Sequence, residues 1–277
     1  MFEILTSANA WVALLTLTFL EIVLGIDNII FISIAANRLP ADQQKKATNW
    51  GLLLAMAQRI ILLFLVSFLV GLSEPFYHIN TSWLTMGISW QAIILFVGGM
   101  FLLYKSTSEI HEKMELPDHD VNELKAKKIS TFSKAIVQIV IIDFIFSIDS
   151  ILTAVGMTSG IGSGPKDALV LMIIAVVISI IIMMTFANPI RVFINKHPSM
   201  QLLALSFLIL IGFMLVTEAA HLSHTQIFGQ EIGAIPKGYL YFAIAFSLLV
   251  EFLNMRFRKK AELIGKNKDN TDGITNR

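Results

Sequence analysis

The stretch FLEIVLGIDNIIF, residues 19–31, decides the fold, because it places Glu21 and Asp27 inside an apolar run long enough to cross a bilayer. A membrane-spanning helix needs about 20 apolar residues. Each carboxylate at the centre of such a helix costs about 2.5–3.5 kcal/mol, against about 0.3–0.6 kcal/mol gained per Leu or Ile. Acids kept at that cost indicate a functional site inside a membrane protein.

The composition of the whole chain predicts an all-α membrane protein. Of its 277 residues 55% are hydrophobic and only 15% are charged. Apolar runs long enough for seven transmembrane helices recur at 11–36, 51–72, 88–104, 135–157, 168–187, 201–220 and 238–256. The first ten residues contain no Lys or Arg, so we expect the first helix to be retained as a span rather than removed as a signal peptide.

Basic residues alternate between the predicted connections. None precedes the first helix, whereas the connections after the first, third and fifth helices hold three, six and two. The connections after the second, fourth and sixth hold none, one and one, and the tail from residue 256 holds seven. Because Lys and Arg accumulate on the cytoplasmic side, the N-terminus is predicted outside and the C-terminus inside. We expect a multi-pass protein of the plasma membrane.

The first helix has a counterpart in the fourth. EIVLGIDNII, residues 21–30, matches DFIFSIDSIL, residues 143–152, and GGMFLLYKSTSEIH from residue 98 more weakly matches IGFMLVTEAAHLSH from residue 211. The second copy lies three spans after the first, so the two copies cross in opposite directions, as in many transporters. The predicted transmembrane domain, 1–256, comprises an inverted three-plus-three repeat, with a seventh helix outside it. Its parts are repeat 1 at 11–104, a cytoplasmic linker at 105–134, repeat 2 at 135–220 and the seventh helix at 238–256. The tail at 257–277 is predicted to be disordered.

The inverted repeat predicts two acidic layers about 9 Å apart, the rise of six helical residues. Glu21 and Asp149 would form the outer layer, and Asp27 and Asp143 the inner one. On a regular helix, acids six residues apart point about 120° apart. We therefore predict a helix break near Gly25, and at the matching Ser147, that turns the acids toward one cavity.

These side chains predict a site for a hard divalent cation. The chain has no cysteine, and the oxygen ligands at the predicted midplane are Glu21, Asp27, Asn28, Asp143, Asp149 and Ser150. Such a set favours Mn²⁺, Mg²⁺ or Ca²⁺ over Cu⁺ or Zn²⁺. Carboxylates left close together when the cation departs favour proton uptake, which predicts coupling to proton exchange. No tightly bound cofactor is expected, since the metal would be the transported substrate.

Further charged groups have two interpretations each. Arg59 in the second helix either neutralises the inner layer when no metal is bound or forms a structural pair with Glu251 in the seventh helix. Glu218, His221 and His224 follow an i, i+3, i+6 spacing at the outer end of the sixth helix. They form either a second metal site or ordinary polar residues at the membrane surface.

With these motifs in hand, the chain resembles the TerC family of bacterial and plastid membrane proteins, within the wider group of LysE-type transporters. The resemblance covers residues 10–256 and rests on FLEIVLGIDNIIFI, GGMFLLYKSTSEIHE, VIIDFIFSIDSILTAVGM and YLYFAIAFSLLVEFLN. The family is named for tellurium-ion resistance, and some members are implicated in manganese export. The resemblance implies a Mn²⁺ exporter whose acidic motif positions fall on the six ligands named above.

The alternative is a membrane-assembly or scaffolding factor without transport activity, with membrane or extracytoplasmic protein partners. A scaffold has no need of four buried acids, which favours transport. An intramembrane aspartyl protease would carry a GxGD element, whereas this chain has LGID and FSID, so we do not expect an enzyme. The near-balanced charge of the linker predicts a solvated segment and no nucleic-acid partner. The expected partners are a divalent metal ion and the lipid bilayer.

Overall fold

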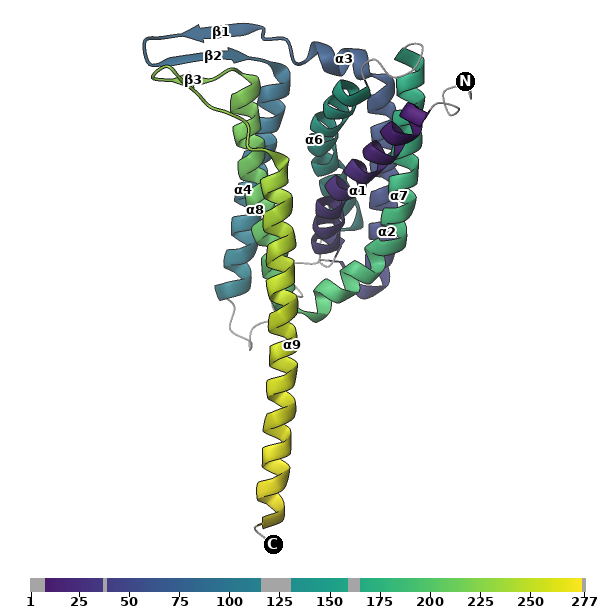
Figure 1. Ribbon diagram of the computed structural model, residues 1–277, viewed down its shortest axis with the longest axis vertical. Coiled ribbons are helices and arrows are strands. Elements are labelled where there is room, and N and C mark those ends of the chain that lie inside the picture. The colour runs from purple at the N-terminus through teal and green to yellow at the C-terminus, as the bar shows by residue number, and fades with distance from the viewer. Residues whose placement is uncertain (1–7, 37–38, 116–130, 159–164, 276–277) are drawn as a thin grey trace. The chain divides into compact units, whose positions relative to one another are not determined.

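The computed structural model describes residues 8–36, 39–115, 131–158 and 165–275, which belong to two units, Met1–Ala234 and Ile235–Arg277. The described residues of the first unit form six long helices and the short α3 (Figure 1). These are α1 (Ala8–Ala36), α2 (Ala41–Phe64), α3 (Val66–Gly71), α4 (Trp90–Glu115), α6 (Phe132–Thr158), α7 (Pro165–Lys196) and α8 (Pro198–Leu222). The second unit contains α9 (Lys237–Thr275).

Six helices in the described part of the chain are long and apolar enough to cross a membrane: α2, α4, α6, α7, α8 and α9. In α1, the described stretch Ala8–Val23 is a shorter apolar helix. The prediction of a multi-pass helical membrane protein is therefore confirmed in this general form.

Two helices continue beyond the ends that the apolar runs suggested. α4 includes residues 105–115, which the sequence assigned to the linker, and an i,i+4 ion pair of 3.2 Å between Lys105 and Glu109 stabilises this extension. α9 includes most of the tail for which disorder was predicted. Residues 116–130 of the predicted linker lie outside the described residues. The length of the apolar run therefore does not by itself determine where these two helices end.

Packing in the first unit follows a regular scheme. α1 lies against α7, α2 lies against α6, and α4 lies against α8. The α4–α8 contact is the tightest of these, because the two backbones meet at a pair of glycines. A Cβ atom at Gly99 would lie 2.7 Å from the Gly212 carbonyl oxygen, and one at Gly212 would lie 2.9 Å from the Gly99 oxygen. Only glycine at both positions permits this approach.

The predicted helix breaks are wrong. α1 is helical from Ala8 to Ala36 and α6 from Phe132 to Thr158, so neither unwinds at Gly25 or Ser147. Gly25 instead provides room for α7, since a Cβ atom there would lie 2.0 Å from the Sδ atom of Met183. The glycine therefore serves helix packing, and the backbone hydrogen bonds of both helices remain in place.

Alanine at Gly25 is expected to be tolerated, with a loss of stability of about 1–3 kcal/mol, because only the flexible thioether of Met183 has to move. Adding Met183→Ala should recover most of this loss by removing the overlap. The measurement is the thermal unfolding midpoint of the purified protein. A loss that Met183→Ala leaves unchanged would contradict the packing role of Gly25.

A small antiparallel sheet, absent from the sequence predictions, lies at one end of the first unit (Figure 1). Its strands are β1 (Tyr77–Asn80), β2 (Leu84–Ile88), β3 (Gln226–Ile227) and β4 (Gln230–Glu231), paired in that order. β1 and β2 come from the connection between α3 and α4, and β3 and β4 follow α8. The strands contain two to five residues, too short for a reliable alternating pattern in sequence.

Candidate functional site

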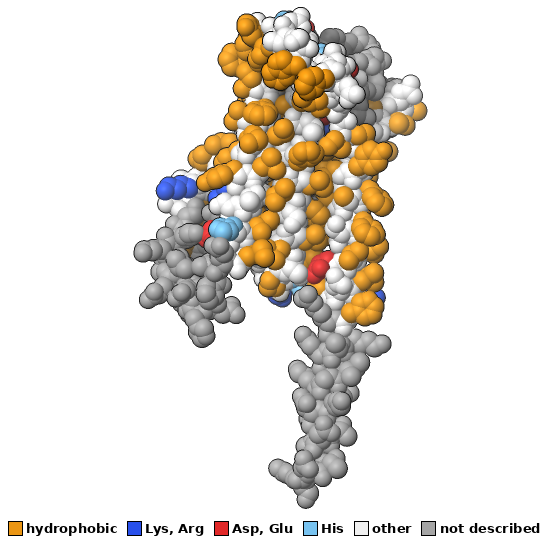
Figure 2. Space-filling model, turned by 90° about the vertical axis from the view of Figure 1, so that its left-hand side faces the viewer, with side chains coloured by type: hydrophobic (Ala, Val, Ile, Leu, Met, Phe, Trp, Pro, Cys, Tyr) orange, Lys and Arg blue, Asp and Glu red, His pale blue; other side chains and the backbone are white. Residues whose placement is uncertain are grey.

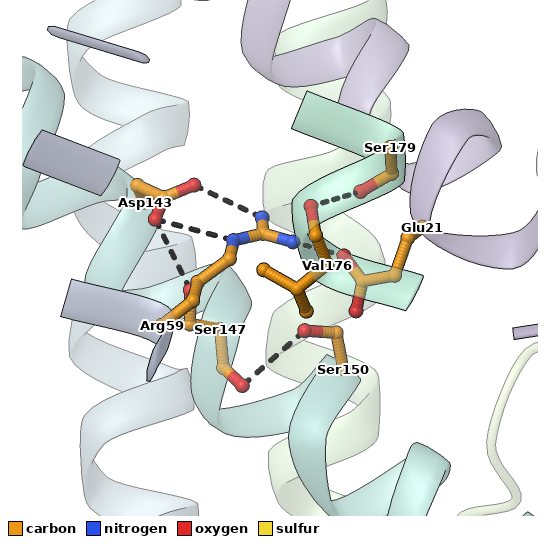
Figure 3. Close-up of polar contacts among 7 residues, drawn as sticks. All are labelled: Glu21, Arg59, Asp143, Ser147, Ser150, Val176 and Ser179. Carbon is orange, nitrogen blue, oxygen red and sulfur yellow. Dashed lines mark hydrogen bonds and ion pairs between the residues drawn. The ribbon is translucent and has the colours of Figure 1, made fainter. Parts of the chain in front are cut away.

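The guanidinium group of Arg59 joins three helices at a buried position. Arg59 lies on α2 and is only 2% exposed. Its Nη1 atom pairs with Oε2 of Glu21 on α1. Its Nη2 atom lies 3.0 Å from Oδ1 of Asp143 on α6, and its Nε donates to Oδ2 of the same carboxylate at 3.4 Å. Figure 3 shows the guanidinium between the two acids. The single positive charge of Arg59 is thus shared between the carboxylates of Glu21 and Asp143.

Residues on α2 and α6 fix the position of Asp143. The Ser147 hydroxyl, one turn along α6, donates to Asp143 Oδ2 at 3.2 Å. The Gln58 amide, oriented so that both of its polar atoms are satisfied, accepts from the Phe144 N–H at 2.9 Å and donates to the Val140 carbonyl at 3.2 Å. These contacts bind α2 to α6 beside the carboxylate and so orient it toward Arg59.

Two buried acids share one arginine at this site. Glu21 and Asp143 are 6% and 4% exposed, and both contact the guanidinium group of Arg59. Buried charges are tolerated only when they are paired and hydrogen-bonded. Two carboxylates held at one buried position also offer the oxygen ligands that hard divalent cations prefer.

Further hydroxyl groups line the same helices. The Ser150 hydroxyl donates to the Ser147 carbonyl at 3.3 Å, and the Ser179 hydroxyl on α7 donates to the Val176 carbonyl at 2.9 Å (Figure 3). Within the described part of the chain, the buried Oγ1 of Thr18, one turn before Glu21, has no hydrogen-bond partner. Sequence reasoning missed Thr18 and misread Ser147 as a helix break. Thr18 lies three residues before Glu21, and Ser147 lies four residues after Asp143. This helical spacing was the available signal in the sequence.

The predicted two-layer arrangement differs from the observed contacts. It placed Glu21 and Asp143 in different layers, whereas both bind the same guanidinium group. The side chain of Arg59 is long enough to reach an acid on either neighbouring helix, which the layer argument did not include. The side chains of Asp27, Asn28 and Asp149 lie outside the described residues. Of the six predicted ligands, the structure therefore describes the side chains of Glu21, Asp143 and Ser150.

Nowhere among the described residues do three His, Asp or Glu side chains gather closely enough to hold a metal ion. Arg59 pairs with acids of α1 and α6, while Glu251 lies on α9 in the second unit. Arg59 thus pairs with Asp143, an acid of the predicted inner layer, and also with Glu21 of the predicted outer layer.

The predicted spacing of Glu218, His221 and His224 does not continue along one helix. α8 ends at Leu222, and His224 has a positive φ of 46°. Its Nδ1 atom lies 3.7 Å from Oε1 of Glu231 on β4. The end of α8 therefore directs His224 toward the sheet, away from the helical face of Glu218 and His221.

Long apolar helices around a buried cluster of charged groups define a multi-pass helical membrane protein with a polar site in its interior. The chain belongs to the integral membrane protein TerC family, whose model matches residues 6–263. The expected family and the expected membrane localisation are both confirmed. This family is one of integral membrane proteins rather than of enzymes.

Curated relatives match nearly the whole length of the chain. The UPF0053 inner membrane protein YgdQ of Escherichia coli K12 is 42% identical over 263 residues, which cover 95% of this chain and 100% of that protein. A UPF0053 protein of Haemophilus influenzae is 40% identical over 259 residues, 94% of this chain and 99% of the relative. The UPF0053 inner membrane protein YoaE of Escherichia coli is 41% identical over 257 residues, which cover 93% of this chain but 45% of that longer protein. No solved structure matches the chain.

Proposed function

We propose that the chain exports a divalent cation, most readily Mn²⁺, across the membrane through the site around Glu21, Arg59 and Asp143, in exchange for protons. The observation that carries the proposal is the buried pair of acids on α1 and α6 that share the guanidinium group of Arg59. Asp27 and Asp149 belong to the same two helices, six residues further along each. In this proposal they complete the ligand set with Asn28 and Ser150.

Arg59 acts in this scheme as the counter-ion of the empty site. A guanidinium group cannot lose its proton under ordinary conditions, so it neutralises the acids whatever the pH. An arriving divalent cation brings two positive charges to the carboxylates, in place of the single charge of Arg59. The Arg59 side chain then moves away from them. When the cation leaves, Arg59 or protons restore the neutralisation. Return of Arg59 keeps the empty site from remaining strongly negative inside the membrane.

Helix packing in the first unit supports an inverted three-plus-three repeat, and α9 is long and apolar enough to be the seventh span. In such a repeat α1 corresponds to α6, and α2 corresponds to α7. The α1–α7 contact therefore has the α2–α6 contact as its counterpart, and both contacts are present. The same correspondence relates Gly99 to Gly212 in the sequence alignment of the repeats, and these two glycines contact each other reciprocally. It also relates Glu21 to Asp143, which share Arg59. We propose the orientation given by the basic connections, with the N-terminus outside and the C-terminus inside.

Asp27→Asn and Asp149→Asn are each expected to reduce Mn²⁺ flux at least about tenfold, because loss of a carboxylate ligand weakens a hard-cation site. The measurement is Mn²⁺ flux in proteoliposomes with an imposed pH gradient, using an internal fluorescent Mn²⁺ indicator. Collapse of the pH gradient by an ionophore should slow the wild-type flux if protons are the exchanged ion.

Glu109→Gln provides the matched control, because Glu109 is also a buried acid, 7% exposed, but lies on α4 and pairs with Lys105. It should keep wild-type flux. Equal flux in the wild type and in correctly folded Asp27→Asn and Asp149→Asn proteins would contradict the site. A wild-type protein without flux of any divalent cation would instead favour the scaffolding alternative.

A further inference from the structure

The four-stranded sheet is amphipathic. Because side chains alternate across a strand, the pairing register places Tyr77, Ile79, Leu84, Met86, Ile88 and Ile227 on one face, which we call the apolar face. The opposite face carries His78, Asn80, Thr85, Gly87, Gln226 and Glu231. Gln230, at the end of β4, is the polar exception on the apolar face. Such a separation indicates that the two faces meet different surroundings.

Large apolar side chains of this sheet remain exposed. Tyr77 on the apolar face is 58% exposed, and Trp83 and Phe228 at the two hairpin tips are 53% and 79% exposed. The Phe228 N–H donates to the Trp83 carbonyl at 2.9 Å, so the two tips are neighbours. Figure 2 shows hydrophobic side chains gathered at this end of the molecule.

Phe228 occupies an unusual turn position. It has a φ of 51° and is followed by Gly229 with a φ of 76°. Turns with two positive φ values normally use Asn, Asp or Gly, because a side chain such as phenylalanine is strained there. An aromatic residue at a strained and exposed position indicates a contact that favours it.

We propose that the apolar face and the two aromatic tips lie in the membrane–water interface and are covered by lipid. The sheet is continuous with membrane-spanning helices: α4 begins two residues after β2, and α8 ends four residues before β3. At this junction the rings of Phe76 and Trp90 stack at 5.0 Å, and both are more than half exposed. Trp and Tyr concentrate at this level of a bilayer.

The charge pattern favours lipid over a protein partner or a second copy of the chain. Residues 75–90 contain no Lys, Arg, Asp or Glu, and residues 223–234 contain only Glu231, which lies on the opposite face. A protein interface normally has a polar rim and often arginine anchors around its apolar centre. An amphipathic element held by lipid needs only an apolar side and a polar side. This inference concerns the sheet and is independent of the transport proposal.

The absence of cysteine from the chain allows a direct test with single introduced cysteines. Ile227→Cys and Gln226→Cys are matched, because the residues are adjacent and exposed but lie on opposite faces. Each protein carries a bimane label and is placed in phosphatidylcholine nanodiscs containing lipid with a doxyl quencher near the head group. Quenching at position 227 should exceed that at 226 by at least about twofold, and iodide in the water should show the reverse order.

Equal doxyl quenching at both positions, or equal access to iodide, would overturn the proposal. A disulfide-linked dimer of Ile227→Cys formed in nanodiscs, with loss of lipid quenching, would assign the face to a second copy. Native tryptophan fluorescence gives an independent measurement without a cysteine. In a variant whose other tryptophans, Trp11, Trp50 and Trp90, are replaced by Phe, brominated phosphatidylcholine should quench the fluorescence of Trp83, and an absence of quenching would also overturn the proposal.

Discussion

Replacing Arg59 with glutamine is expected to destabilise the fold by about 3–5 kcal/mol, because it leaves Glu21 and Asp143 buried without their cation. Glutamine retains hydrogen-bonding groups but cannot compensate two carboxylates. The measurement is the thermal unfolding midpoint of the purified protein at neutral pH.

Two further variants separate charge from side-chain size. Combining Arg59→Gln with Glu21→Gln and Asp143→Asn removes all three charges and should recover most of the loss. Arg191→Gln is a control on α7, where the arginine donates to the Gln44 side chain at 2.5 Å and no carboxylate partner is described, so it should cost less. An Arg59→Gln protein as stable as Arg191→Gln would show that the acids do not depend on Arg59.

Replacing Gly99 with alanine is expected to have the second large effect. The new Cβ atom would lie 2.7 Å from the Gly212 carbonyl oxygen and 2.8 Å from Cγ2 of Val216. A backbone oxygen cannot rotate away, so α4 and α8 have to separate along their contact. We expect a loss of about 3 kcal/mol or more, at the upper end of the range for overpacking, measured as the unfolding midpoint.

The informative comparison is with Gly25→Ala, which introduces the same methyl group. There the obstructing atom belongs to the flexible side chain of Met183, so Gly99→Ala should be the more damaging change. Gly212→Ala should resemble Gly99→Ala, because the contact is reciprocal. If Gly25→Ala costs as much as Gly99→Ala, backbone proximity does not explain the α4–α8 contact.

Apolar length and the cost of buried acids were sufficient to predict the helical membrane fold and to single out Glu21 and Asp143. Both predictions depend on the cost of placing single residues in a membrane. That cost follows from the type of each residue, which the sequence gives directly. Arg59 was also recognised as a buried cation, but its acids were assigned to separate layers. Which acids an arginine reaches depends on the distances between helices. The spacing of residues along one helix does not give those distances.

Other features depend on neighbours distant in the sequence. Gly25 looked like a helix break because a glycine beside two acids fits that role, yet its reason is the thioether of Met183 on α7. The sheet was missed because its two hairpins come from connections more than 130 residues apart, and each is too short to indicate a strand alone. In both cases a tertiary contact overrides the local pattern.

The unbroken course of α1 and α6 has a mechanical consequence. A helix that keeps its full ladder of hydrogen bonds behaves as a stiff rod, so a rotation at one end appears at the other. If a movement of α1 separates Glu21 from Arg59, the helix therefore has to turn or tilt as a whole, and the contact of Gly25 with Met183, about one turn along the same helix, moves with it. A movement of α1 that separates these charges therefore also slides α1 along α7.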